Sequence, residues 1–179
     1  MEKRVFSNPH VKDKVTFVKT SKETGGEYTL LEVELGPGGG TPLHAHTSFD
    51  EQFTAIDGVL GIVVEKNKVL LRPGQSTSAL VGKFHRFYNP GKGNIRFAVK
   101  ITPSCESFEN SLKIAYGLAE DGKANKKGIP KSFSHMALLT TMADTVLPGA
   151  LSMIVPVMKW KARRAIRKGV YQELVEKYC

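Results

Sequence analysis

Hydrophobic and polar residues alternate along most of the first hundred residues of the chain. Alternation of this kind sends one side chain into a core and the next into solvent, and it is typical of half-buried β-strands. Asp-Gly, Pro-Gly and Asn-Pro-Gly turns interrupt the runs after a few residues each. The pattern predicts strands at residues 15–20, 28–35, 51–56, 59–65, 68–71, 75–80, 85–89 and 95–102. Many short strands at this spacing indicate a sandwich or a barrel.

The periodicity becomes helical after Pro103-Ser104. Ser104 is expected to cap a first helix, because a serine hydroxyl accepts from the free N–H groups of a helix's first turn. The Asp121-Gly122 pair ends that helix. Further helices are predicted at residues 134–146 and, with bends near Pro156 and Gly169, at residues 149–178.

This change of pattern predicts two parts, a β-barrel domain at residues 1–104 and a helical C-terminal extension at residues 105–179. The two cysteines, Cys105 and Cys179, are too few for a disulfide framework, so a reducing, cytoplasmic location is expected. The charged amino terminus lacks the apolar run of a secretory signal. No stretch has the length of apolar sequence needed to span a bilayer.

Three histidines and one glutamate of the β-region have the chemistry and spacing of metal ligands. His44 and His46 lie two residues apart in an extended segment, so their side chains point the same way. Glu51 opens the next predicted strand, and His85 opens another further along the chain. Mixed imidazole and carboxylate ligands suit iron, manganese, nickel, zinc, cobalt or copper. One divalent transition metal is therefore the predicted cofactor.

The segments that carry these residues resemble the two motifs of the cupin superfamily. The first motif is glycine, five residues, His-x-His, three or four residues, Glu, six residues and Gly. It is matched at Gly38, His44, His46, Glu51 and Gly58. The second motif is matched at Gly74, Gly82, His85 and Asn89, with Leu80 in place of the usual proline. That departure affects a turn and no ligand.

The resemblance spans about residues 30–102 and implies a mainly β fold. The expected architecture is a double-stranded β-helix, or jelly-roll barrel, followed by the α-helical C-terminal extension. The resemblance also implies that His44, His46, Glu51 and His85 hold the metal. It does not imply one reaction, because a fold does not settle a function.

We favour a metal-dependent, oxygenase-like enzyme that acts on a small organic molecule inside the barrel, with dioxygenase and isomerase as the classes considered. Tyr28, Phe53 and Phe87 are candidates for lining its pocket, although such residues are as often plain core. No separate catalytic acid or base is identifiable. A non-enzymatic module that binds or senses a small ligand is the alternative.

The C-terminal extension raises a separate question about partners. The chain has a net charge of +9, and six basic residues fall within 159–168, beside Trp160 and after the apolar run 147–158. Contact of residues 147–168 with an anionic membrane surface is one interpretation. We favour a helix packed on the barrel or on a second subunit, with its charged face in water. Nucleic acid is not expected, because no binding motif accompanies the charge. The cupin resemblance implies a homodimer that buries exposed strands.

Overall fold

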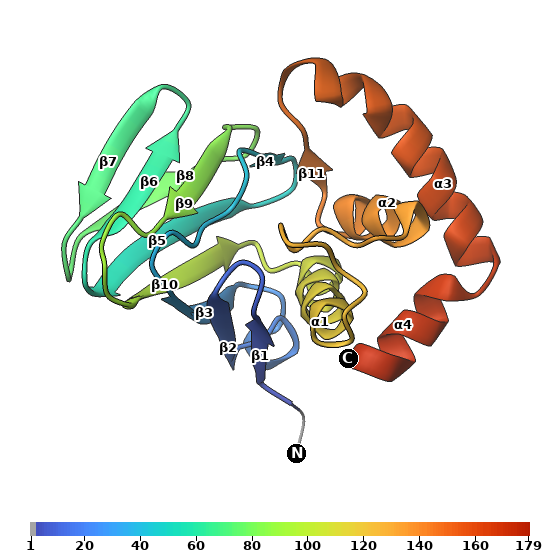
Figure 1. The fold of residues 1–179 in the computed structure, drawn as a ribbon, viewed down its shortest axis with the longest axis horizontal. Coiled ribbons are helices and arrows are strands. Elements are labelled where there is room, and N and C mark those ends of the chain that lie inside the picture. Colours follow the sequence, from blue (N-terminus) through green and yellow to red (C-terminus); the bar gives the residue numbers. More distant parts are fainter. Residues whose placement is uncertain (1–2) are drawn as a thin grey trace.

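The chain folds with its β-sheets on one side and its helices on the other (Figure 1). A computed structural model describes residues 3–179, except for the side chain of Leu151. The strands are β1 (Val5–Asn8), β2 (Asp13–Lys19), β3 (Thr29–Leu35), β4 (Ala45–His46), β5 (Asp50–Asp57), β6 (Leu60–Val64), β7 (Asn67–Leu71), β8 (Ser76–Ala79), β9 (His85–Tyr88), β10 (Ile95–Thr102) and β11 (Thr145–Val146). The helices are η1 (Lys22–Thr24), α1 (Glu106–Glu120), α2 (Phe133–Met142), η2 (Gly149–Ile154), α3 (Val155–Arg167) and α4 (Val170–Tyr178).

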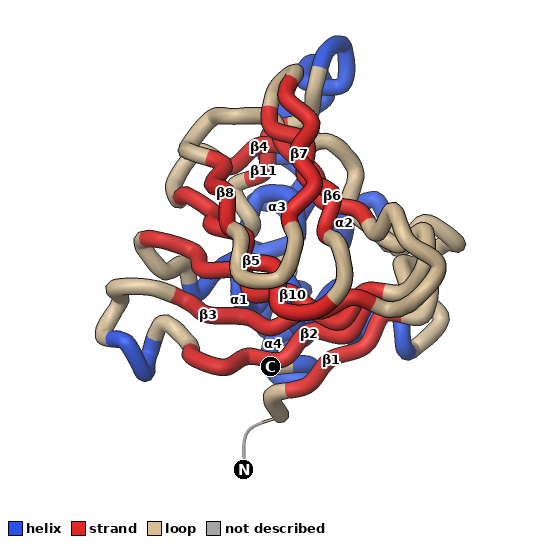
Figure 2. Tube along the Cα trace, turned by 90° about the vertical axis from the view of Figure 1, so that its left-hand side faces the viewer, coloured by secondary structure: helices blue, strands red, loops and turns tan. Residues whose placement is uncertain are grey.

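Three antiparallel sheets build the β-part. The largest has the strand order β1-β2-β3-β10-β5-β8, and the others are β7-β6-β9 and β11-β4. Figure 2 shows the strands of the largest sheet in succession. Side chains alternate between the faces of each strand, so Leu31 and Val33 of β3 meet Phe97 and Val99 of β10 in the buried core. The mainly β, jelly-roll fold with a helical C-terminal part, which the sequence predicted, is confirmed.

Helix α1 joins the two parts because it contributes to both hydrophobic cores. Its Phe108 and Tyr116 belong to the core of the β-sheets. Its Ile114 and Leu118 belong to a second core, which also contains Leu138, Leu139, Met142, Ala162 and Leu174 from α2, α3 and α4. Strand β10 ends at Thr102 and α1 begins at Glu106, close to the predicted change of pattern.

Two local predictions need correction. The helix expected at residues 134–146 ends at Met142, because Asp144 takes a left-handed conformation (φ 51°) and the β-branched Thr145 and Val146 then form β11. Ser104 does not cap α1: its hydroxyl is 2.7 Å from that of Ser21, and Cys105 stands at the cap position without a side-chain hydrogen bond.

Strand β1 was not predicted. It pairs with β2 after a turn at residues 9–12, and its Phe6 is buried against the ring of Phe17. The alternation in β1 covers only four residues, which is too short for a periodicity signal.

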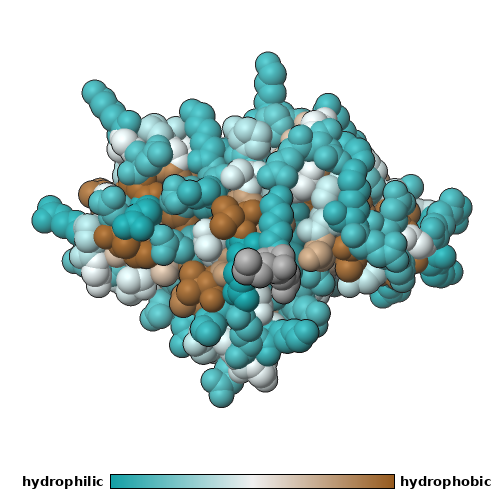
Figure 3. Space-filling model, turned by 90° about the horizontal axis from the view of Figure 1, so that it is seen from below, coloured by the Kyte–Doolittle hydropathy of each residue, from teal (hydrophilic) through white to brown (hydrophobic). Residues whose placement is uncertain are grey.

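The surface is dominated by hydrophilic side chains. The face seen from below is mostly hydrophilic, with smaller hydrophobic patches between the polar groups (Figure 3). Large apolar side chains that remain exposed include Leu70 and Leu80 of the β-part and Met153 and Trp160 of the helical part. Within residues 3–179, no helix has the combination of length and apolar character required to cross a bilayer.

Candidate metal centre

His44 and His85 are placed side by side by their own backbones. The N–H of His44 donates to the carbonyl of His85 (3.0 Å), and the N–H of His85 donates to the carbonyl of His44 (2.7 Å). This two-residue bridge brings their ring centroids to 4.5 Å. His46 follows on the same side of β4, with its ring centroid 4.9 Å from that of His44. The His-x-His spacing therefore places both rings on the same side of the extended segment, as strand geometry predicts.

Glu51 reaches the same point from β5, which lies between β10 and β8 in the largest sheet. It lies opposite Ile101 of β10 and Ala79 of β8, and its side chain is buried. The turn before β9 is held by Gly82, whose N–H donates to the carbonyl of His46 (2.7 Å). Gly82 has a φ of 77°, a conformation that a side chain would strain, so glycine is required there.

The four candidate ligands converge. One ligand atom from each of His44, His46, Glu51 and His85 lies within 4.8 Å of the other three. These are the four residues selected from the sequence, and they come from separate segments of the chain.

Each histidine ring is oriented by a backbone carbonyl. The Nδ1 atoms lie 2.8 Å from the carbonyl of Pro42 for His44, 2.8 Å from that of Ala143 for His46, and 2.9 Å from that of Lys83 for His85. A carbonyl oxygen can only accept, so Nδ1 carries the proton and donates in each case. The Nε2 atoms are thereby turned toward the cluster, which is the arrangement found around metal-binding histidines.

Metal coordination needs neutral imidazoles and an ionised carboxylate, and the surroundings of His44, His46 and Glu51 favour these protonation states. Burial lowers the pKa of His44 to about 4, although the charge of Glu51 acts in the opposite direction. Burial likewise lowers the pKa of His46. Burial opposes the ionisation of Glu51, but the hydrogen bond with His85 and the nearby imidazoles together keep its pKa below the ordinary value. His44 and His46 therefore favour the neutral imidazole, and Glu51 favours the carboxylate.

Glu51 and His85 form a tight pair. Oε2 of Glu51 is 2.7 Å from Nε2 of His85 and 3.9 Å from Nε2 of His46. Burial works against a charged His85, but the hydrogen bond to Glu51, the charge of that carboxylate and the hydrogen bond to Lys83 together raise the pKa of the ring.

His46 provides the test of whether these residues fit a metal. Its Nε2 is buried and has no hydrogen-bond partner in the described part of the chain. A buried polar atom without a partner carries a desolvation penalty of about 1–3 kcal/mol. A cation at the centre of the cluster would remove that penalty, and three imidazoles with one carboxylate suit a divalent transition metal. The residues present therefore fit the predicted cofactor.

Aromatic side chains surround the cluster. Phe53 lies next to His85, with ring centroids 6.0 Å apart, and Phe87 packs beside Phe53 and Phe97. Both predicted pocket residues thus lie in the interior next to the ligands. Tyr28 does not. Its ring lies 4.7 Å from the ammonium group of Lys100, an exposed residue of β10, and so faces away from the interior.

Two further aromatic residues were not selected from the sequence. Phe49 stacks on the ring of His46 at 4.4 Å, and Phe108 of α1 meets the same ring edge-on at 5.7 Å. Phe49 lies between two ligands in the sequence, which was an available signal. No sequence signal indicated Phe108, because its contact with the His46 ring depends on how α1 packs against the barrel.

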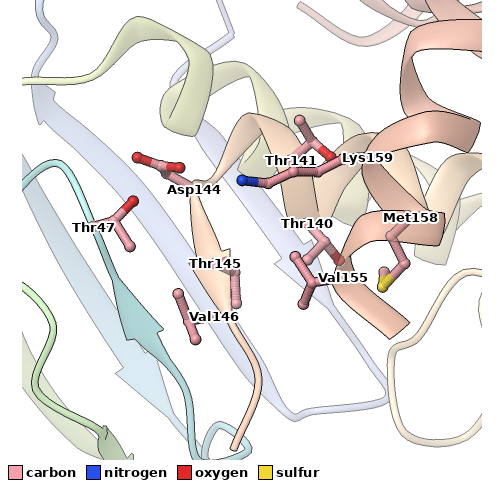
Figure 4. Close-up of a pocket in the computed structure, with 9 residues that line it drawn as sticks. All are labelled: Thr47, Thr140, Thr141, Asp144, Thr145, Val146, Val155, Met158 and Lys159. Carbon is pink, nitrogen blue, oxygen red and sulfur yellow. The ribbon is translucent and has the colours of Figure 1, made fainter. Parts of the chain in front are cut away.

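The helical extension also contributes directly to this region. β11 pairs with β4, so that Thr145 lies opposite His46, and the carbonyl of Ala143 just before β11 orients the His46 ring. A small pocket of about 40 Å³ lies between these strands and helices α2 and α3 (Figure 4). None of the four ligands lines it, and its volume is close to that of one or two water molecules.

Comparison with known proteins places this site in context. Residues 31–101 match the family model described as "Cupin domain". A solved structure of KdgF from a Halomonas species is similar, with 15% identity, a TM-score of 0.49, and 55% of this chain and 84% of that chain covered.

Two other solved structures have comparable similarity. A predicted oxalate decarboxylase from Thermotoga maritima has 17% identity and a TM-score of 0.49, covering 51% of this chain and 80% of that chain. A sugar phosphate isomerase from Silicibacter pomeroyi has 23% identity and a TM-score of 0.48, covering 57% and 71%. No curated protein matches the sequence significantly.

Proposed function

We propose that this chain, whose residues 31–101 match the cupin domain family, is a metal-dependent, oxygenase-like enzyme acting on a small organic molecule inside the barrel. The observation that supports the proposal is the convergence of four ligand atoms within 4.8 Å of one another around the unpartnered Nε2 of His46. His44, His46, Glu51 and His85 would hold one divalent transition metal. When bound, that metal supplies Lewis-acid or redox chemistry.

The protein's own contribution is preorganisation. Three Nδ1–H groups donate to backbone carbonyls, and these hydrogen bonds orient the rings. A site whose polar groups are fixed in advance needs little rearrangement when charge develops. Oε2 of Glu51, which is hydrogen-bonded to Nε2 of His85, supplies the negative charge of the cluster.

The aromatic walls suit an apolar or aromatic part of a substrate. Phe53 and Phe87 flank the cluster on the barrel side. Such side chains exclude water and thereby strengthen electrostatic interactions between a substrate and the polar groups of the site. We therefore expect small phenols and diketones to be suitable first substrates.

The first experiment measures metal content. Protein purified without a chelating tag is analysed for transition metals, next to the variants His44→Ala and His10→Ala. His10 is a matched control, since its side chain lies outside the cluster. We expect about one metal per chain in the parent and in His10→Ala, and a loss in His44→Ala. Equal metal content in all three proteins would overturn the proposed site.

The second experiment tests turnover. Iron-loaded protein is incubated aerobically with a panel of phenols and diketones while oxygen uptake is followed. Uptake by the parent and by His10→Ala, but not by His44→Ala, supports the oxygenase. Metal binding without turnover on a broad panel would instead identify a module that binds or senses a small ligand.

A further inference from the structure

Helix α3 presents two different faces, and only one of them is used within the chain. Met158, Ala162 and Ala165 are spaced by four and three residues, and they are buried against the other helices. This spacing describes one side of a helix. Helix α3 therefore packs on the other helices of the extension, and it does so with one side alone.

The opposite side carries large apolar residues in solvent. Met153 at the end of η2 is 76% exposed, Val157 is 52% exposed and Trp160 is 56% exposed. Val157 and Trp160 lie three residues apart and share a helix face, and Met153 precedes that face by one turn. Figure 1 places α3 on the outside of the molecule, on the side away from the sheets.

Basic residues continue the same face toward the carboxyl end of α3. Arg163, Arg164 and Arg167 follow Trp160 at spacings of three, four and seven residues, and all are exposed. The chain has six basic residues and no acidic residue between Asp144 and Glu173. Among the ion pairs found in the described part of the chain, none involves α3. The positive charge of this face is therefore not neutralised by acidic neighbours.

We propose that the outer face of α3, made of Met153, Val157, Trp160, Arg163, Arg164 and Arg167, docks on an anionic lipid bilayer surface. The apolar side chains would enter the headgroup region, with Trp160 at the interface, while the guanidinium groups contact lipid phosphates. An apolar stripe flanked by cations is the pattern by which helices lie in the plane of a membrane. The inference goes beyond the metal site and does not depend on it.

Charge argues against the other occupants of this face. A second copy of the chain, docked symmetrically, would bring a second set of cations onto the first, and like charges across an interface disfavour association. Nucleic acid would use the arginines but would give no partner to Met153 and Val157. Anionic lipid is complementary to both components of the face, since it offers negative phosphates above an apolar layer.

Trp160 makes a direct test available, because it is the only tryptophan of the chain. The full-length protein is mixed with vesicles of phosphatidylcholine containing 30 mol% phosphatidylglycerol, or with vesicles of phosphatidylcholine alone. We expect a blue shift of the tryptophan emission, and pelleting of the protein, with the anionic vesicles. Both effects should weaken in 0.5 M salt and should not depend on metal loading.

Paired variants distinguish docking through α3 from non-specific binding of the protein to vesicles. Arg163→Gln with Arg164→Gln and Arg167→Gln should weaken vesicle binding on the order of 100-fold, since each cation near an anionic surface contributes appreciably. Lys66→Gln with Lys83→Gln and Lys92→Gln removes the same charge from exposed positions of the barrel and should change binding little. Val157→Ser, compared with Leu70→Ser on β7, makes the same comparison for apolar contacts.

Three results would overturn the proposal. The first is equal binding to neutral and anionic vesicles. The second is equal loss of binding in the α3 and barrel variants. The third is a blue shift that depends on protein concentration in the absence of lipid, which would identify a second copy as the occupant of this face.

Discussion

The β-barrel and the helical extension of this chain differ in the size of the hydrophobic core that each of them builds. The barrel core contains large side chains from the six-stranded and the three-stranded sheet, and Phe53, Phe97 and Ile62 are almost fully buried. The helical core is smaller, and α3 leaves Val157 and Trp160 in solvent. The larger core holds together the strands that carry Glu51 and His85, whereas the exposed apolar side chains of α3 belong to the face that we propose to dock on lipid.

The two regions nevertheless meet at the metal centre. Three of the four ligands receive all of their orientation from the barrel, but His46 depends on the carbonyl of Ala143 and on the cover of Phe108. Substitutions in each region can therefore test whether the extension is a separate attachment or part of the site.

The largest effect is expected from deleting core side chains. Phe97→Ala should destabilise the whole barrel by about 3–5 kcal/mol, because it opens a cavity between tightly packed residues. Leu138→Ala should cost about 2–5 kcal/mol, but mainly in the helical core. Denaturant unfolding combined with amide hydrogen exchange distinguishes the two. If Leu138→Ala loosens the β-strands as much as α2–α4, the two regions form one cooperative unit.

The next effect concerns the ligands themselves. Glu51→Gln keeps the shape of the side chain but removes its charge, so metal affinity should fall more than about 100-fold, beyond the 10–100-fold typical of supporting residues. Competition with a chelator measures the affinity. Glu27→Gln, at an exposed position outside the cluster, is the matched control. An affinity preserved in Glu51→Gln would mean that this carboxylate is not a ligand.

A smaller effect is expected at β11. Thr145→Pro should displace the Ala143 carbonyl, since a residue before proline avoids helical conformations and Asp144 has a φ of 51°. Metal affinity should drop about 10–100-fold, as for the loss of a supporting hydrogen bond. Thr145→Val retains the β-branched shape and should bind metal normally. The Nδ1–H resonance of His46 should shift in the proline variant and stay in place in the valine variant.

The smallest effect concerns the seam between β2 and α1, where the hydroxyl of Tyr116 donates to Oδ2 of Asp13 (2.6 Å). Burial raises the pKa of Asp13 to about 6, although the Tyr116 hydrogen bond acts in the opposite direction. The folded state therefore holds this proton more tightly than the unfolded state. Its contribution to stability is complete below about pH 4 and is lost as the pH rises through about 6.

Asp13→Asn removes this titration and leaves an oxygen that can accept from Tyr116. The variant should therefore be more stable than the parent at pH 8, by about 2 kcal/mol, and equally stable at pH 4. Unfolding midpoints measured across this range provide the check. A stability difference that does not change with pH would contradict the assignment.

Much of the fold and all four residues of the proposed ligand set could be predicted from the sequence. Short alternating runs between glycine and proline turns indicate a β-barrel wherever they occur, because the side-chain period of two is a local property. The two cupin motifs are local as well. The first contains His44, His46 and Glu51, and the second contains His85. The homodimer, the cytoplasmic location and the boundary between two domains stay predictions.

Contacts between distant segments were decided only by the tertiary structure. Nothing in the sequence near Ala143 predicts that its carbonyl meets His46, since 97 residues separate the two. The conversion of residues 145–146 from a predicted helix into β11 has the same origin, because β4 supplies the pairing partner. Tyr28 lies beside Lys100, a position that alternation could not predict, because alternation does not establish which face of a strand turns inward at the strand's end. Local patterns determine elements and motifs, whereas packing determines which side chains from different elements meet.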